Sequence, residues 1–268
     1  MSSKISFKEL YFLSTHGISN RVISEMCGLG KSTVSYQQRK YGLCDVRTNK
    51  PVNMKNYSFN KIDTPEKAYA LGFMLADSNI DEKDIVEVSV AMCDKEIVKF
   101  ISDVIGSNVS ESYILNKSKR RFPRCRTSRK IKDITKFTGG RGKKERHYPI
   151  VRKDLERYLL LGFFDGDGCI TWGRRKDRNR IWHKISFTSS FSILSGVQQF
   201  LFKLGITTKL KPKQNEDCFV LEFSNKKDVL KFLEYIYPNE EFIILQRKYL
   251  KYSALRLELE EFGRTTNE

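Results

Sequence analysis

The stretch Leu161–Ile170, LGFFDGDGCI, ends an apolar run in two carboxylates that alternate with glycine, Asp165-Gly166-Asp167-Gly168. An earlier stretch, Leu71–Ile80, reads LGFMLADSNI and carries Asp77 at the place of Asp167. The two acids are 90 positions apart (167 minus 77). A repeat of this length predicts that the chain contains two similar folding units.

Small residues stand four positions apart in both copies of this motif. They are Gly72 and Ala76 in the first copy, and Gly162 and Gly166 in the second. On a helix these positions share one face, where missing side chains let two backbones approach closely. Because glycine inside a helix costs about 1 kcal/mol relative to alanine, a packing reason is needed. We therefore expect the two motif helices to pack against each other.

Each predicted motif helix ends in a carboxylate, Asp77 or Asp167. Side-by-side packing would bring both acids to one end of the shared seam, where the helix C-termini add partial negative charge. Mg²⁺ or another hard divalent cation is the expected cofactor, because it accepts one or two carboxylates together with waters and phosphate oxygens. Such an ion can activate water and stabilise the leaving oxygen of a phosphodiester.

The order of elements after each motif is also repeated, and it predicts an α+β fold. Each unit reads as αββαββα, and two units are expected to form antiparallel sheets about a pseudo-two-fold axis. In the first unit the closing helix is predicted at residues 128–138, SRKIKDITKFT. When the two units are aligned by sequence, Val88-Ser89-Val90 corresponds to Ile185-Ser186-Phe187. The predicted domains are 1–44, a linker at 45–62, a first half at 63–150 and a second half at 151–268.

The composition points to a polyanionic partner. Among 268 residues there are 49 Lys and Arg against 32 Asp and Glu, a formal net charge of +17. Nucleic acid is the commonest target of such an excess, and a membrane surface is the weaker alternative. No signal peptide and no apolar run of roughly 18 to 20 residues is recognisable, so we expect no membrane association and a cytoplasmic, nucleoid-associated protein, or one in the host cytoplasm if phage-encoded. The six cysteines form no C-x-x-C pair, which argues against a zinc site.

The first 44 residues read as three short helices. The stretch ISNRVISEMCGLGKSTVSYQQRKYGL, residues 18–43, resembles a helix-turn-helix, whose second helix enters the DNA major groove. The alternative is a helical hairpin that only packs on the rest of the chain. Predicted contacts to base edges or phosphates are Ser32, Thr33, Ser35, Tyr36, Gln37, Arg39 and Lys40.

Basic side chains in both halves predict further DNA contacts. Between Lys117 and Arg146 there are fourteen Lys or Arg and two acids. Arg124 and Arg126 alternate along one predicted strand, so they can share a face that enters a groove. The predicted contacts are Lys119, Arg121, Arg124 and Arg126 in the first half, and Arg174, Arg175, Arg178, Arg180, Lys209, Lys211 and Lys213 in the second.

These motifs resemble the two-motif LAGLIDADG homing endonucleases, with a helix-turn-helix added at the N-terminus. The stretches that carry the resemblance are AYALGFMLADSNI (68–80), YLLLGFFDGDGCI (158–170) and YIYPNEEFIILQRKYLKY (235–252). The resemblance implies saddle-like sheets and a monomer that breaks both strands of duplex DNA. It also implies Asp77 and Asp167 as the metal-binding acids.

The same resemblance implies a basic residue near each active centre. The candidates are Lys143 or Lys144 in the first half, and Arg247 or Lys248 in the second. We assign Lys144 and Lys248 as stabilisers of developing charge.

The first motif departs from the second on both sides of its acid. Leu75 replaces Asp165, and Ser78-Asn79 replaces Gly168-Cys169, but the acid Asp77 is retained. Two alternatives to the endonuclease stay open: a non-cleaving DNA-binding regulator, and an RNA-splicing maturase on the same scaffold. RNA is the less favoured partner.

Overall fold

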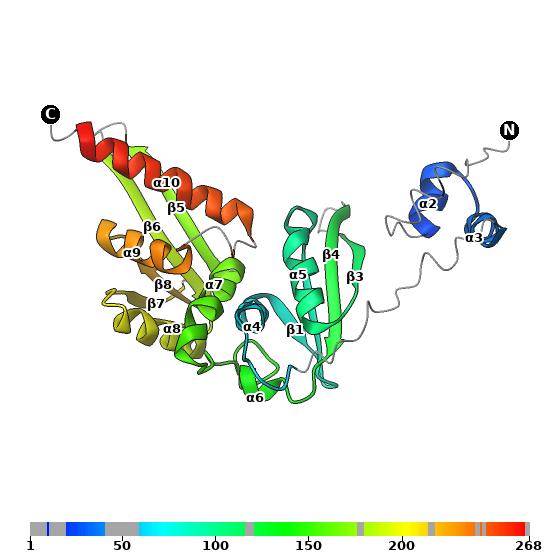
Figure 1. Cartoon of the computed structure of the whole chain (residues 1–268), viewed down its shortest axis with the longest axis horizontal. Helices are drawn as coiled ribbons and strands as arrows, with labels where there is room; N and C mark the ends of the chain where they lie inside the picture. Colours follow the sequence, from blue (N-terminus) through cyan, green and yellow to red (C-terminus); the bar gives the residue numbers. More distant parts are fainter. Residues whose placement is uncertain are drawn as a thin grey trace. The chain divides into compact units, whose positions relative to one another are not determined.

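The computed structural model describes residues 10, 20–40, 59–115, 121–175, 180–213, 218–238, 242 and 245–265 (Figure 1). The chain divides into two compact units, Met1–Met54 and Lys55–Glu268. Each unit is described by itself. No helix within the described ranges combines the length and apolar character needed for crossing a bilayer.

The N-terminal unit contains the helices α2 (Asn20–Cys27) and α3 (Lys31–Lys40). Gly28 begins the turn between them with a φ of 62°, a left-handed conformation that glycine adopts without steric cost. Leu10, Ile23 and Val34 form a small buried cluster under the two helices. The first of the three predicted helices lies outside the described residues except for Leu10.

The larger unit repeats one order of elements twice, as the sequence predicts. The first half contains α4 (Pro65–Asp77), β1 (Ser78–Ile80), β2 (Ile85–Ala91), η2 (Met92–Asp94), α5 (Lys95–Ile105), β3 (Val109–Leu115), β4 (Arg121–Lys130) and α6 (Thr135–Thr138). The second contains η3 (Lys153–Leu155), α7 (Glu156–Asp167), β5 (Gly168–Arg175), β6 (Arg180–Ser189), α8 (Phe191–Lys203), β7 (Lys209–Pro212), β8 (Phe219–Phe223), α9 (Lys226–Ile236) and α10 (Gln246–Thr265).

The strands form two antiparallel four-stranded sheets with matching topology. Their orders are β1-β2-β4-β3 and β5-β6-β8-β7. This confirms the α+β fold class and the duplicated arrangement. The predicted closing helix of the first half is wrong over residues 128–130, which belong to strand β4, and only Thr135–Thr138 are helical. Those three residues pair with Ile85, Val86 and Glu87 of β2, so sheet hydrogen bonds override the local helical pattern.

The start of helix α4 follows from its sequence. The Thr64 side chain accepts a hydrogen bond from the Lys67 backbone N–H at 3.3 Å, and Pro65 occupies the first helical turn. A capping hydroxyl satisfies one of the backbone donors that a helix start leaves unpaired, and proline has no N–H to leave unpaired.

Helices α4 and α7 form the central contact of the larger unit (Figure 1). A Cβ added to Gly72 would lie 2.0 Å from the Leu159 carbonyl oxygen, and one added to Gly162 would lie 2.0 Å from the Tyr69 carbonyl oxygen. These two contacts are related by the same 90-residue offset as the motifs. Backbone therefore meets backbone at both glycines, and any side chain there would force the helices apart.

Nearer the helix ends, Gly166 faces Ala76. A Cβ added to Gly166 would lie 2.3 Å from the Ala76 Cβ, so the seam has room for one methyl group at this level. One copy of the repeat carries that methyl group and the other copy lacks it.

The sheet register corrects the alignment of the two halves. Ser78 pairs with Val88, and the equivalent Gly168 pairs with Phe187. Val88 therefore corresponds to Phe187 and not to Ile185. The β5–β6 hairpin is two residues longer than the sequence alignment assumed, which moves the correspondence by two positions. In both sheets the buried side chains face the helices and the alternate residues are more exposed.

The single methyl group between Ala76 and Gly166 gives a double-mutant test. Gly166→Ala is expected to lower the free energy of unfolding by about 1–3 kcal/mol, because the added methyl group overpacks the seam. Adding Ala76→Gly to that variant should return stability close to wild type, since the methyl group has only changed sides. Chemical denaturation of both single variants and the double variant measures the coupling. Additive effects of the two changes would contradict this packing.

Candidate active site

The packing of α4 against α7 brings their last residues, Asp77 and Asp167, into electrostatic contact. Burial, the largest cause, and the charge of Asp77 together raise the pKa of Asp167 to about 7. The positive charges of Lys143 and Lys248 and a hydrogen bond with Ser189 oppose this rise. Asp77 is exposed, whereas Asp167 is half-buried. The two predicted acids therefore share one electrostatic environment at the end of the seam.

Asp77 lies between two cavities. The larger, about 470 Å³, is lined by Asp77, Ser78, Asn79, Ile80, Glu87, Ser89, Arg141, Gly142, Lys143 and Arg146. The smaller, about 150 Å³, is lined by residues from both halves: Phe73, Asp77, Val90, Ala91, Asp94, Ile97, Arg124, Asp165, Gly166 and Arg247. The acid thus faces open space in which a substrate group can approach it.

A buried cation stabilises the end of each motif helix. The Lys248 ammonium donates to the carbonyl oxygens of Phe164, Asp165 (2.9 Å) and Gly168 (2.6 Å). Arg146 donates to the carbonyls of Met74 (3.1 Å), Leu75 (3.2 Å) and Ser78 (3.2 Å). These are the same three positions of the repeat. The carbonyls at a helix C-terminus have no partner within the helix, so each cation supplies the missing donors.

Lys248 is 4% exposed and directs its three N–H groups to these carbonyls. These hydrogen bonds hold the C-terminal end of α7 in place, and with it the adjacent Asp167. Burial lowers the pKa of Lys248 to about 8, although the negative charge of Asp165 opposes that shift. Its assigned role in stabilising developing charge stays a prediction.

Arg146 was missed by sequence reasoning. It is 1% exposed, but its neighbourhood, RGKKER, contains three other basic residues that look equivalent in the sequence. The signal that separates Arg146 is its burial against the end of α4, which depends on the path of the loop. Lys144, the assigned residue, is exposed and does not line either cavity.

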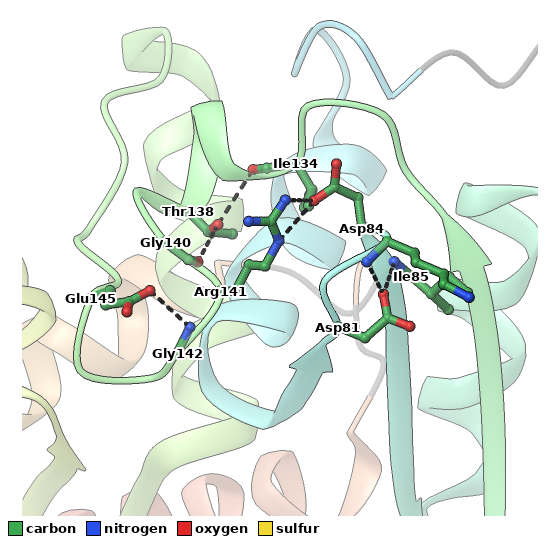
Figure 2. A network of polar contacts seen from close by, with 10 residues as sticks. Asp81, Asp84, Ile85, Ile134, Thr138, Gly140, Arg141, Gly142 and Glu145 are labelled. Atoms are coloured by element: carbon green, nitrogen blue, oxygen red, sulfur yellow. Dashed lines mark hydrogen bonds and ion pairs between the residues drawn. The ribbon is translucent and has the colours of Figure 1, made fainter.

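The loop that carries Lys143 and Arg146 is held by polar contacts (Figure 2). Arg141 contacts the Asp84 carboxylate with Nε at 3.1 Å and Nη2 at 2.6 Å. The Thr138 hydroxyl donates to the Gly140 carbonyl at 2.9 Å, and the Gly142 N–H donates to Glu145 at 3.2 Å. Because the loop is fixed at both ends, Lys143 reaches the end of α4, where its Nζ donates to the Ala76 carbonyl at 2.8 Å.

Asp165 occupies a buried polar cluster at the seam. The Tyr69 hydroxyl donates to its Oδ2 at 2.7 Å, and the Tyr237 hydroxyl donates to its Oδ1 at 3.3 Å. Burial raises the pKa of Asp165 to about 6, although the charge of Lys248 and both tyrosine hydrogen bonds oppose the rise. Tyr69 belongs to α4, so this carboxylate joins the two halves. The first motif has apolar Leu75 at the equivalent position.

The exposed faces of the two sheets carry charged side chains. Arg124 donates from Nε to the Ser89 hydroxyl at 3.2 Å and from Nη2 to the Ser89 carbonyl. Arg126 donates to the Ser110 hydroxyl at 3.2 Å. In the second sheet, Glu222 is 3.2 Å from Lys184 and 3.4 Å from Lys211. Lys209, Lys211 and Lys213 are exposed.

Other predicted DNA contacts are placed differently. Arg174 is paired with Glu258 of α10 at 2.6 Å. On α3, Ser32, Thr33 and Tyr36 are exposed, whereas Ser35 and Gln37 are half-buried and Ser35 accepts a hydrogen bond from Asn20. Lys119 and Arg178 lie outside the described residues, as do the side chains of Arg39, Lys40, Arg121, Arg175 and Arg180.

The acids at the seam fit a hard divalent cation. Carboxylates are ligands that Mg²⁺ accepts from proteins, and a bound cation would offset both the burial of the Asp167 charge and its repulsion by Asp77, which together raise the pKa of Asp167. In the part of the chain that the structure describes, no cluster of three or more His, Cys, Asp or Glu residues could hold a metal. An ion between Asp77 and Asp167 would therefore complete its coordination with waters and substrate oxygens.

Comparisons with known proteins agree with this architecture. Residues 154–237 match the family model described as LAGLIDADG-like domain. No curated protein sequence matches the chain.

Several solved structures share the fold. One is the homing endonuclease I-WcaI bound to its DNA recognition sequence, with 17% identity, coverage of 76% of this chain and 95% of that chain, and a TM-score of 0.51. Another is the LAGLIDADG meganuclease I-AabMI bound to uncleaved DNA, with 11% identity, coverage of 74% and 92%, and a TM-score of 0.52. A third is the homing endonuclease I-GzeII in complex with a DNA target, with 8% identity, coverage of 75% and 92%, and a TM-score of 0.53.

The buried cations give a stability prediction. Lys248→Met is expected to lower the free energy of unfolding by about 1–3 kcal/mol, because three carbonyls at the end of α7 lose their donor. Lys248→Arg should lose less, since an arginine makes the equivalent contacts in the first half. Urea denaturation compares both with Lys251→Met, which removes an exposed lysine of the same helix. An equal loss in Lys248→Met and Lys251→Met would contradict this role.

The raised pKa of Asp167 gives a pH prediction for the metal-free protein. An acid whose pKa is higher in the folded state than in the unfolded state costs stability once it ionises, so the cost grows from about pH 4 and is complete above about pH 7. Asp167→Asn removes that charge. The variant should gain on the order of 1 kcal/mol or more at pH 8 relative to its effect at pH 4, measured by denaturation in EDTA. The same effect at both pH values would exclude this linkage.

Proposed function

We propose that this chain, which contains a LAGLIDADG-like domain, is a metal-dependent endonuclease that cuts both strands of a specific DNA duplex. The observation that carries the proposal is the pairing of Asp77 and Asp167 at one end of the α4–α7 seam, each on a helix end held by a buried cation. A protein that only binds DNA gains nothing from two carboxylates beside phosphates. The DNA-bound homing endonucleases that share the fold support the same conclusion.

Asp77 and Asp167 would hold Mg²⁺, which when bound supplies an activated water and charge stabilisation for the leaving oxygen. The chain's own residues fix the geometry of this site. Arg146 and Lys248 hold the turns from which the two acids project. Because each half contributes one acid, each would address one strand of the duplex.

Lys143 is the first-half cation best situated to contact a phosphate. It lines the larger cavity with Asp77, and its charge acts on Asp167. One of its three N–H groups is directed to the Ala76 carbonyl, so two remain for a substrate oxygen. We therefore favour Lys143 over Lys144 for stabilising developing negative charge in the first half.

The exposed sheet faces would bind the DNA, with the N-terminal unit as an additional contact. Arg124, Arg126, Lys209 and Lys211 project from strands, and a strand face can enter the major groove. The exposed Ser32, Thr33 and Tyr36 suit a recognition helix at α3. A single chain carries both acids, so a monomer would suffice for double-strand cleavage.

The test is cleavage of a randomised duplex library by the purified full chain with Mg²⁺ or with EDTA. Wild type is expected to make double-strand breaks at one long motif only when metal is present. Asp77→Asn and Asp167→Asn are each expected to lose double-strand cleavage by at least 100-fold and to leave nicks, because one acid of the pair is lost. Asp103→Asn, an exposed acid on α5, is the matched control and should cut normally.

Each alternative gives a different result in this experiment. Specific retention of one duplex without cleavage under any metal condition would favour a DNA-binding regulator. Tight binding of a structured intron RNA in preference to every duplex would favour a maturase.

A further inference from the structure

The sheet register defines equivalent positions on the two exposed faces. Val88 corresponds to Phe187, and these residues pair with Thr127 of β4 and Leu221 of β8. The preceding residues on those strands, Arg126 and Val220, are therefore equivalent. In the first sheet Arg126 pairs with Ser89 and Ser110, and in the second Val220 pairs with Thr188 and Lys211.

The two faces carry their charges on different strands. In the first sheet the cations Arg124 and Arg126 stand on β4, and the neighbouring positions of β3 are serines. In the second sheet the equivalent positions are Val220 on β8 and Cys218, which directly precedes that strand, and Lys211 stands on β7. The positive charge of Lys211 in the second sheet therefore lies one strand nearer the sheet edge than that of Arg126 in the first sheet. Neighbouring strands are about 4.8 Å apart.

The two arginines of the first face are held in place by their neighbours. Ser89 receives both Nε and Nη2 of Arg124, and Arg124 also lines the smaller cavity with Asp77. Arg126 is oriented by Ser110 at 3.2 Å and by Glu87 at 3.7 Å, and its side chain is 49% exposed. A guanidinium fixed before binding loses less rotamer freedom when it meets its partner. Both residues keep N–H groups that no described protein contact occupies.

We propose that Arg124 and Arg126 are specificity-determining residues that select guanine in the half-site facing the first sheet, and that Val220 makes no such selection in the other half-site. Arginine pairs with O6 and N7 of guanine through two parallel hydrogen bonds, whereas valine has no donor. The inference rests on the proposed function, since it requires the sheet faces to bind duplex DNA. It predicts a preferred guanine on one side of the target centre without a counterpart at the mirror position.

On the exposed face of the second sheet, the acid Glu222 forms ion pairs with Lys184 and Lys211. Burial tends to raise the pKa of Glu222, but hydrogen bonds and charges from Lys184 and Lys211 outweigh it and keep the pKa below its usual value. Glu222 therefore stays ionised between two lysines. With part of their charge neutralised, these lysines suit phosphate positioning better than base selection.

The experiment is selection of bound duplexes from a randomised library in EDTA, where binding is measured without cleavage. Wild type is compared with Arg126→Val, Arg126→Lys and Val220→Arg, all in the full chain. Arg126→Val is expected to lose guanine preference at one position by about 5- to 150-fold, the discrimination of one bidentate pair. Arg126→Lys should also lose most of it, because lysine keeps the charge but not the planar fork.

Val220→Arg makes the test reciprocal. It should create a guanine preference at the mirror position, where wild type has none, and so move the selected motif toward a palindrome. Lys211→Ser is the matched control, because serine is the residue at the equivalent position, Ser110. That change should weaken all sequences alike and reduce the salt dependence of binding by about one phosphate contact.

Two outcomes separate this inference from the proposed function. If wild type selects a motif and Arg126→Val weakens every sequence equally with the motif unchanged, Arg126 contacts phosphate and the inference is overturned. If the wild-type protein enriches no duplex at all, both the proposed function and this inference fail. Circular dichroism of each variant establishes that the sheet is intact before selection.

Discussion

The close approach of the α4 and α7 backbones is the constraint on which the rest of the larger unit depends. At Gly72 and Gly162 a carbonyl oxygen of the opposite helix occupies the space where a Cβ would stand. Backbone contact at two related points fixes the position of one helix along the other. Because both helices end in an acid, fixing the helices also fixes the acids, and the two sheets follow directly from the same helix ends at Ser78 and Gly168.

Two buried helices that end side by side concentrate unpaired carbonyl groups and negative charge, and each half of the structure compensates for them with a buried cation. The carbonyls at each C-terminus need donors, and the carboxylates add negative charge to the same region. Arg146 and Lys248 answer this need with the same three carbonyl positions, although they come from a loop in one half and from a helix in the other. The halves differ where Asp165 replaces Leu75, and two tyrosine hydroxyls satisfy the additional carboxylate.

The duplication constrains the buried side of the structure more than its exposed side. Strand order, register and helix contacts agree between the halves, because each sheet must cover the same kind of apolar layer. The exposed faces carry different charges on different strands, as Arg126 and Val220 illustrate. A common scaffold with two different faces suits a ligand whose two halves share a shape but differ in chemistry, as the strands of a duplex do.

The sequence by itself determined the duplicated α+β fold, the small-residue seam and the position of Asp77 and Asp167 at the ends of the two motif helices, because these features leave periodic and repeated patterns along the chain. The start of α4 is also encoded locally, because Thr64 and Pro65 act within the first turn of the helix. Sequence reasoning misjudged residues 128–130, whose helical pattern yielded to pairing with β2, and it aligned Val88 with Ile185, because hairpin register depends on partners far away in the chain. Only the tertiary structure distinguished Arg146 from its basic neighbours, removed Lys248 from solvent and fixed Arg124 against Ser89. Burial and hydrogen bonding between distant residues decide these roles, and such contacts leave no periodic signal in the sequence.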